Sequence, residues 1–92
     1  MNLLPKTKIV LVGSGLILTK VNEDGTTARH FDGTIAMQFR YTIVPDSEAD
    51  AISDRYSESL PASQALLGHL VGDIVETTFD DMPIRVRVQS ID

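Results

Sequence analysis

The 92-residue chain is long enough for one domain, and a domain of this size buries roughly 60–70% of its unfolded surface. Hydrophobic residues make up 42% of the sequence, a fraction typical of globular proteins and not of disordered ones. The absence of cysteine excludes disulfides, thiol nucleophiles and cysteine-ligated metal sites, and the net charge of −5 disfavours direct nucleic-acid binding.

The apolar stretches are too short for a membrane helix. Residues 9–18 are interrupted by Gly13-Ser14-Gly15, whereas a membrane-spanning helix needs about 20 apolar residues. The N-terminus also lacks the charged region and small-residue cleavage site of a signal peptide. With no cysteine to suggest an oxidising compartment, we expect a cytoplasmic protein without a membrane partner.

The chain is expected to begin with an irregular lead-in over residues 1–7, which contains Pro5 as a breaker. Residues 8–12 and 15–21 are apolar and β-branched, which favours two strands. The Gly-Ser-Gly segment between them predicts a break or bulge.

Two Asp-Gly pairs predict turns at residues 22–25 and 32–33, with a return strand over residues 26–31 between them. Residues 34–44 then alternate between apolar and polar side chains, which is the period of a half-buried strand. The apolar face of this strand is expected to contain Ile35, Met37, Phe39, Tyr41 and Ile43.

An acidic connector over residues 46–54 and a short strand at Tyr56 lead to a short helix. The helix is expected to begin at Pro61, because proline suits the first helical position, and to end at Gly68, because glycine suits the left-handed position after a helix. So short a helix must be held by packing. Its expected contacts are Ala65, Leu66, Leu67 and Leu70.

Two strands, over residues 74–79 and 84–91, are predicted to follow the helix, with a turn at residues 80–83 between them. Several antiparallel strands with one short helix place the chain in the α+β class. No internal repeat, linker or low-complexity tract divides the sequence.

No arrangement of residues predicts catalysis or a bound cofactor. Gly13-Ser14-Gly15 lacks the third glycine of a dinucleotide fingerprint, since Leu18 stands there, and a strand follows where a helix is needed. His30 and His69 lie 39 residues apart and do not have the spacing of metal ligands. Asp80-Asp81 are expected in a turn, where aspartate is favoured without a metal. We therefore expect no catalytic residues, no metal and no cofactor.

Residues 61–73 read Pro-Ala-x-x-Ala-Leu-Leu-Gly-x-x-Val-Gly-Asp. This order resembles the C-terminal domain of the Gre family of bacterial transcript-cleavage elongation factors. The resemblance begins near Tyr41-Thr42-Ile43-Val44 and continues to the last strand, so that it covers residues 41–92 well and residues 8–40 loosely. It implies that residues 1–92 form a single Gre C-terminal-like domain with an FKBP-like fold, a curved antiparallel sheet wrapping one short helix.

The resemblance also implies a partner, bacterial RNA polymerase, on which this domain docks at the rim of the secondary channel. Carried over by position, the docking surface includes Ser59, Leu60, Pro61, Ala62 and Leu66. The family has an Asp-Ser pair before the proline, in which the serine suits a helix cap. Here Leu60 cannot cap the helix. Either Ser59 caps a helix with a shifted start, or the free backbone N–H groups at the helix N-terminus bond to water. Leu60 itself is either a contact residue or a buried staple.

Gre factors also carry an N-terminal coiled coil whose acidic tip helps to hold the catalytic magnesium of the polymerase. No heptad pattern exists in this sequence, so we expect a non-catalytic module that regulates elongation. The first alternative is the docking half of a longer cleavage factor. The second is an FKBP-like prolyl-peptide binder or isomerase, which is disfavoured because the aromatic residues are needed for the core. These are Phe31, Phe39, Tyr41, Tyr56 and Phe79.

Overall fold

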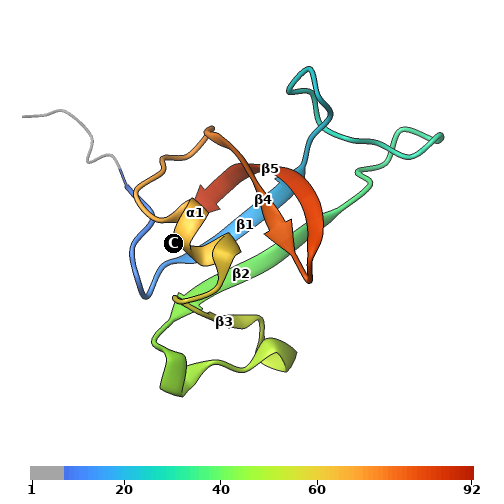
Figure 1. Ribbon diagram of the computed structural model, residues 1–92. Helices are drawn as coiled ribbons and strands as arrows, with labels where there is room; N and C mark the ends of the chain where they lie inside the picture. The colour runs from blue at the N-terminus through green and yellow to red at the C-terminus, as the bar shows by residue number, and fades with distance from the viewer. Residues whose placement is uncertain (1–7) are drawn as a thin grey trace, which may run out of the picture.

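The computed structural model describes residues 8–92, and the predicted lead-in at residues 1–7 lies outside them. Five strands form one curled sheet, and one short helix packs on its concave side (Figure 1). The strands are β1 (Gly15–Lys20), β2 (Gln38–Val44), β3 (Arg55–Ser57), β4 (Ile74–Phe79) and β5 (Met82–Ile91). The helices are α1 (Pro61–Leu66) and two 3-10 turns, η1 (Asp46–Glu48) and η2 (Ala51–Ser53). The predicted α+β class is confirmed.

The strand order in the sheet is β3-β2-β1-β5-β4. Neighbouring strands are antiparallel except β2 and β3, which are parallel, so the sheet is mixed where only antiparallel pairing was expected. The acidic connector explains the difference. It forms η1 and η2 and carries the chain back along the sheet edge, so that β3 runs in the same direction as β2.

The strand predicted over residues 8–12 is wrong. These residues make only an isolated bridge between Ile9 and Leu70, in the loop after α1. Val10 is buried and its backbone bonds to both His69 and Gly68, whereas Leu11 is exposed. The apolar run therefore anchors the loop after the helix instead of extending the sheet.

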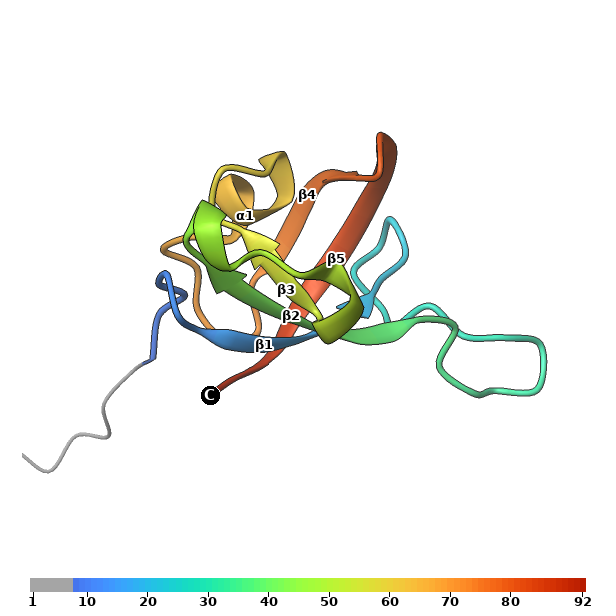
Figure 2. The same cartoon turned by 90° about the horizontal axis from the view of Figure 1, so that it is seen from below.

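The return strand predicted over residues 26–31 is also wrong. Residues 21–37 form two successive loops that project from the sheet (Figure 2), with only isolated bridges inside them. The expected strand over residues 34–44 begins later, at Gln38, so Ile35 and Met37 lie outside the sheet and are partly exposed. Phe31, expected in the core, is fully exposed.

The core fills the concave side of the sheet beneath α1. Its fully buried members include Leu16 from β1, Tyr41 and Ile43 from β2, Val88 from β5 and Leu66 from α1. The predicted contacts Ala65 and Leu67 pack against this core, but Leu70 is partly exposed. Gly68 follows the helix with φ +86°, the left-handed position expected of it.

Four of the five aromatic side chains form one cluster in this core. Tyr41 stacks on Tyr56 at a centroid distance of 4.3 Å, and Phe39 stacks on Phe79 at 5.5 Å. The two pairs meet edge to face, with Tyr56 and Phe79 centroids 5.4 Å apart. The expectation that these four rings build the core is confirmed.

Candidate docking site

The residues before α1 form a loop without a helix cap. Leu60 is the N-cap residue with extended backbone angles, and it makes no side-chain capping bond. Pro61 occupies the first helical turn, where its missing N–H leaves nothing unsatisfied. Ser59 does not cap the helix either, because its hydroxyl donates to both oxygens of Asp46, at 2.8 and 3.0 Å. Of the two alternatives left open by the sequence, capping by Ser59 is therefore wrong.

Asp46 holds this loop in place from the far end of the acidic connector. Its carboxylate accepts hydrogen bonds from the hydroxyls of Ser57 and Ser59, and these two bonds hold the pKa of Asp46 below its usual value. The Ser57 hydroxyl accepts in turn from the backbone N–H of Ser59 at 3.1 Å. One carboxylate therefore fixes the two residues that lead into the helix.

A second, buried network supports the loop from below. Ser63 is fully buried, donates its hydroxyl to the carbonyl of Ser57 at 2.6 Å, and lies 2.7 Å from the Tyr41 hydroxyl. Burial raises the pKa of Tyr41, so its hydroxyl stays neutral. The amide of Gln64 donates to the carbonyl of Glu58 at 2.6 Å. These bonds attach the loop to both the helix and β2.

Leu60 and Pro61 are exposed, and Leu60 is 39% exposed, so Leu60 is not a buried staple. Both line a hollow of about 350 Å³ that continues to Phe79 and to the turn between β4 and β5. Asp80 and Asp81 in this turn add two carboxylates to the same rim. The site thus combines an exposed apolar centre with an acidic edge.

The predicted site residues therefore divide into two groups. Ser59, Leu60 and Pro61 lie at the surface and are close enough for one partner to contact. Ala62 is buried but borders the hollow, and Leu66 is fully buried, so in this conformation Leu66 can only support the surface from beneath. The burial follows from helical spacing, since residues four apart lie on the same face, here the face turned to the sheet.

The sequence did not reveal the other walls of this site. Tyr56, Phe79, Asp80 and Asp81 come from strands and a turn that meet the helix start only in the folded chain. Asp46 lies 13 residues before Ser59, and no spacing rule predicts that contact. Only a map of contacts between distant residues could have identified them.

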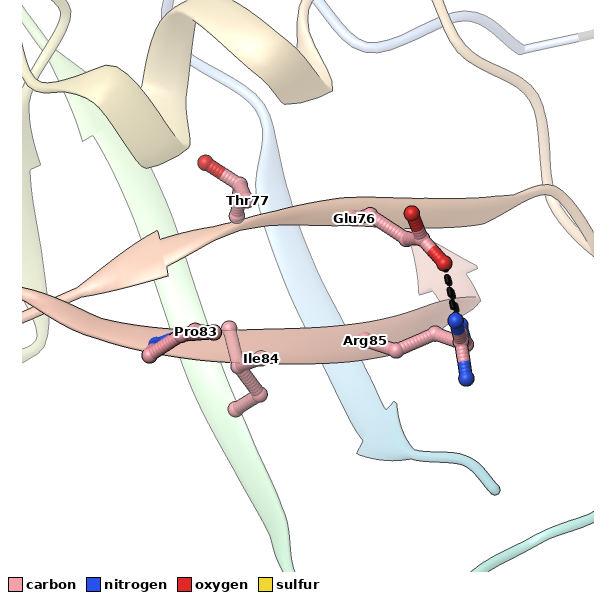
Figure 3. Close-up of a pocket in the computed structure, with 5 residues that line it drawn as sticks. All are labelled: Glu76, Thr77, Pro83, Ile84 and Arg85. Atoms are coloured by element: carbon pink, nitrogen blue, oxygen red, sulfur yellow. Dashed lines mark hydrogen bonds and ion pairs between the residues drawn. The ribbon is translucent and has the colours of Figure 1, made fainter. Parts of the chain in front are cut away.

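A smaller hollow of about 300 Å³ lies on the β4–β5 hairpin (Figure 3). It is lined by Thr77, Pro83 and Ile84 and is bordered by the ion pair between Glu76 and Arg85, in which Arg85 Nε lies 2.6 Å from the carboxylate. All five side chains come from one hairpin, so this hollow has no wall on its far side.

The side chain of His69 contacts an acidic residue in the loop after α1. Its Nδ1 lies 2.9 Å from the carboxylate of Asp73, which also accepts from the backbone N–H of Leu70. The hydrogen bond from the Leu70 N–H, together with that from His69, lowers the pKa of Asp73.

Within residues 8–92, no three His, Asp or Glu side chains gather as metal ligands do. No helix in this part of the chain has the length and hydropathy to cross a membrane.

Comparison with known proteins identifies the family. A family model described as "Transcription elongation factor, GreA/GreB, C-term" matches residues 19–92. Transcription elongation factor GreA of Acetivibrio thermocellus is 33% identical over 75 residues, covering 82% of this chain and 47% of that protein. GreA of Limosilactobacillus fermentum is 41% identical over 51 residues, covering 55% of this chain and 32% of that protein.

Solved structures show the same fold. GreA factor homolog 1 (Gfh1) of Thermus thermophilus superposes with a TM-score of 0.71 at 22% identity, over 94% of this chain and 49% of that one. GreA/GreB from Nitrosomonas europaea superposes with a TM-score of 0.66 at 25% identity, over 96% of this chain and 62% of that one. The predicted FKBP-like arrangement of a curled sheet around one short helix is thereby confirmed.

The chain spans only a third to about half of the length of the curated relatives it matches. The family match nevertheless runs from the end of β1 to the last residue and so includes β2 to β5 and α1. The chain therefore belongs to the GreA/GreB family of transcription elongation factors and corresponds to the C-terminal domain of that family.

Proposed function

We propose that this chain is a non-catalytic RNA polymerase-binding module that regulates transcription elongation in the bacterial cytoplasm. It docks at the rim of the polymerase secondary channel and makes no direct contact with nucleic acid. The observation that carries this proposal is the family match over residues 19–92, which includes α1 and the strands β2 to β5. The net charge of −5 supports a protein partner with basic patches over a nucleic-acid partner.

The contact surface is the exposed loop at Ser59, Leu60 and Pro61, with Ala62 and Leu66 supporting it from below. Leu60 and Pro61 supply an apolar centre beside the hollow, and desolvated apolar centres carry most of the affinity of small interfaces. Asp80 and Asp81 place negative charge on the rim, which favours a basic partner surface and speeds its association. The loop is held in one conformation by Asp46, so little ordering entropy is lost on binding.

The test is a pull-down of bacterial RNA polymerase at micromolar concentration and low salt, using the wild-type chain and a Leu60→Asp/Pro61→Asn double variant. We expect the double variant to lose at least tenfold in affinity, because it places charge and a free N–H in the apolar centre. Circular dichroism and thermal melting establish that the variant is folded.

The matched control is Phe31→Asp, which also places a charge at an exposed apolar residue but on the projecting loops. It is expected to bind as the wild type does. No binding by the wild type overturns the proposal, and equal binding by wild type and double variant moves the interface away from the helix start.

A second candidate is the docking half of a longer transcript-cleavage factor. The observation in its favour is that the matched relatives are two to three times as long as the aligned segment. A reading frame that continues upstream through a coiled coil decides for this candidate, and a stop codon immediately upstream decides against it.

A third candidate, a prolyl-peptide binder or isomerase, has only the FKBP-like fold in its favour. Tyr41, Tyr56, Phe39 and Phe79 pack on one another in the core, which leaves fewer ring faces for a peptide. Catalysis of prolyl isomerisation above the uncatalysed rate would support this candidate over polymerase docking.

A further inference from the structure

The two projecting loops have the same construction. Asp24 and Asp32 each accept hydrogen bonds from the backbone N–H and hydroxyl of the threonine two residues on, with N–H distances of 3.0 Å in both loops. These bonds lower the pKa of both carboxyls. A glycine with positive φ lies between each aspartate and its threonine, where other residues are strained. Each loop is therefore a rigid turn and not a slack connection.

The first loop is attached to the sheet, but the second is not. Arg87 donates to the Thr27 hydroxyl at 2.9 Å and to the Gly25 carbonyl at 2.6 Å, which fastens the first loop to β5. Residues 29–35, which we call the arm, extend beyond these contacts (Figure 2). The arm is braced internally by two backbone bonds, from the His30 N–H to the Thr34 carbonyl and from the Gly33 N–H to the His30 carbonyl. Arg29 also donates to the Gly33 carbonyl at 2.8 Å.

Phe31 stands at the tip of the arm with its ring fully exposed. An aromatic ring buries about 150–250 Å² when it finds a pocket, so a rigid arm that holds one in solvent is an unused binding element. The ring is not packed against its own chain and is therefore available to a partner.

A groove that suits such a ring lies at the base of the same arm. It has a volume of about 560 Å³ and is lined by apolar side chains together with Lys20 and Asp80. Met37, the residue just after the arm, forms one wall, and Met82, which is 68% exposed, forms another. The apolar lining is completed by Phe39, Tyr56, Phe79, Pro83 and Ile84.

The positions of ring and groove make the arm self-complementary. The ring lies at the tip of the arm and the groove lies at its base. When the arms of two copies lie side by side and antiparallel, the tip of each arm therefore meets the base of the other. That arrangement has two-fold symmetry and closes on itself as a dimer. The charges are also complementary, since the arm carries Arg29 and Asp32, whereas the groove carries Asp80 and Lys20.

We propose that two copies of this chain associate through their arms, with Phe31 of each copy seated in the groove lined by Met37, Met82 and Phe79 of the other. Because the interface comprises only two seven-residue arms and two grooves, we expect it to fall among weak interfaces, which bury less than about 1,200 Å². The dimer accordingly forms in the high micromolar range and dissociates on dilution.

The first test is sedimentation and NMR translational diffusion of the chain from about 20 µM to 1 mM. The wild type is expected to shift from monomer to dimer, and Phe31→Ser to stay monomeric over the whole range. Ile52→Ser is the matched control, since Ile52 is 97% exposed but lies in η2, outside both arm and groove. It is expected to dimerise as the wild type does. A wild type that stays monomeric at 1 mM overturns the proposal, as does a Phe31→Ser variant that dimerises equally well.

The second test locates the contact. Because the chain has no cysteine, His30→Cys gives a single attachment point for a nitroxide beside the ring. Mixed with an isotopically labelled, unmodified chain, it is expected to broaden the signals of Met37 and Met82 of the labelled copy. Broadening at Leu60 or Val71 instead, with none at the two methionines, means that the arm binds elsewhere and overturns the assignment of the groove.

Discussion

At the scale of the residue, the hydroxyl of Ser63 joins α1 to two other segments of the chain. It is fully buried in α1, yet it bridges the Tyr41 hydroxyl on β2 and the Ser57 carbonyl before the helix. A buried polar group without a partner is costly, and Ser63 supplies a partner to the Tyr41 hydroxyl and a second donor to the Ser57 carbonyl, which also accepts from the Leu60 N–H.

Ser63→Ala is therefore expected to lower the free energy of unfolding by about 1–3 kcal/mol, because the Tyr41 hydroxyl and the Ser57 carbonyl both lose a partner. Urea denaturation measures the change. Ser53→Ala is the control, since Ser53 is exposed and its hydroxyl bonds only to Asp50, so the expected change is within about 0.5 kcal/mol. Equal stabilities for both variants would contradict the bridging role.

At the scale of the element, the turn of the β4–β5 hairpin places two consecutive residues other than glycine in the left-handed region. Its two turn residues, Asp80 and Asp81, have φ angles of 51° and 65°. Two positive φ angles define a type I′ turn, which matches the twist of the strands but favours Asn-Gly. Glycine occupies this region freely, whereas another residue costs about 1–2 kcal/mol. The turn was predicted from its residue types, but its strain was not.

Asp80→Asn/Asp81→Gly is expected to raise the free energy of unfolding by about 0.5–1 kcal/mol, less than the full relief because glycine also gains freedom in the unfolded chain. Asp81→Ala is the matched control and is expected to be destabilising, since alanine tolerates positive φ less well than aspartate. Thermal melting distinguishes the two. A lower melting temperature for the Asn-Gly variant would show that the carboxylates, and not the backbone, stabilise this turn.

Several elements were predicted wrongly for a related reason. Residues 8–12 have the composition of a strand, but a strand needs a neighbour, and Ile9 finds only Leu70. Residues 34–37 continue the alternation of β2, but β1 ends at Lys20, so no partner strand exists there. Alternation reports which side chains favour a sheet, whereas pairing decides where the sheet ends.

At the scale of the whole molecule, the stability of the fold depends on ionised aspartates spread over its surface. Hydrogen bonds from Thr26, Thr34, Ser57 and the Leu70 backbone, respectively, are the main reason that four pKa values are lowered. The residues are Asp24, Asp32, Asp46 and Asp73. A lowered pKa in the folded state means that the unfolded chain binds protons first as the pH falls.

The stabilising effect of these carboxylates is therefore complete above about pH 4 and is lost as the pH falls through the lowered pKa values of the folded state. Urea denaturation is expected to give the same free energy of unfolding at pH 7 and pH 5 and a lower value at pH 3. In the Asp46→Asn variant, the decrease in the free energy of unfolding between pH 5 and pH 3 is expected to be smaller than in the wild type. Stability that stays constant or rises down to pH 3 would contradict this account.

The sequence by itself determined the α+β class, the position of α1 and the family. Pro61 and Gly68 bracket the helix through their own backbone preferences, which need no partner. The ordered residues of 61–73 were enough to indicate the Gre C-terminal domain, and the family match confirms it. These features depend on residues that are neighbours in the sequence, so the sequence alone is enough to predict them.

Only the tertiary structure decided the surroundings of the site and the exposure of single residues. The hollow beside Leu60 needs Phe79 and Asp80, and the loop needs Asp46, which no sequence spacing connects to it. Phe31 looked like a core residue by composition, but the bonds of Asp32 to Thr34 hold it at the tip of an arm. The burial of a residue and its contacts depend on which distant segments of the chain pack together. They are therefore set only in the folded molecule, in which the sheet curls around α1.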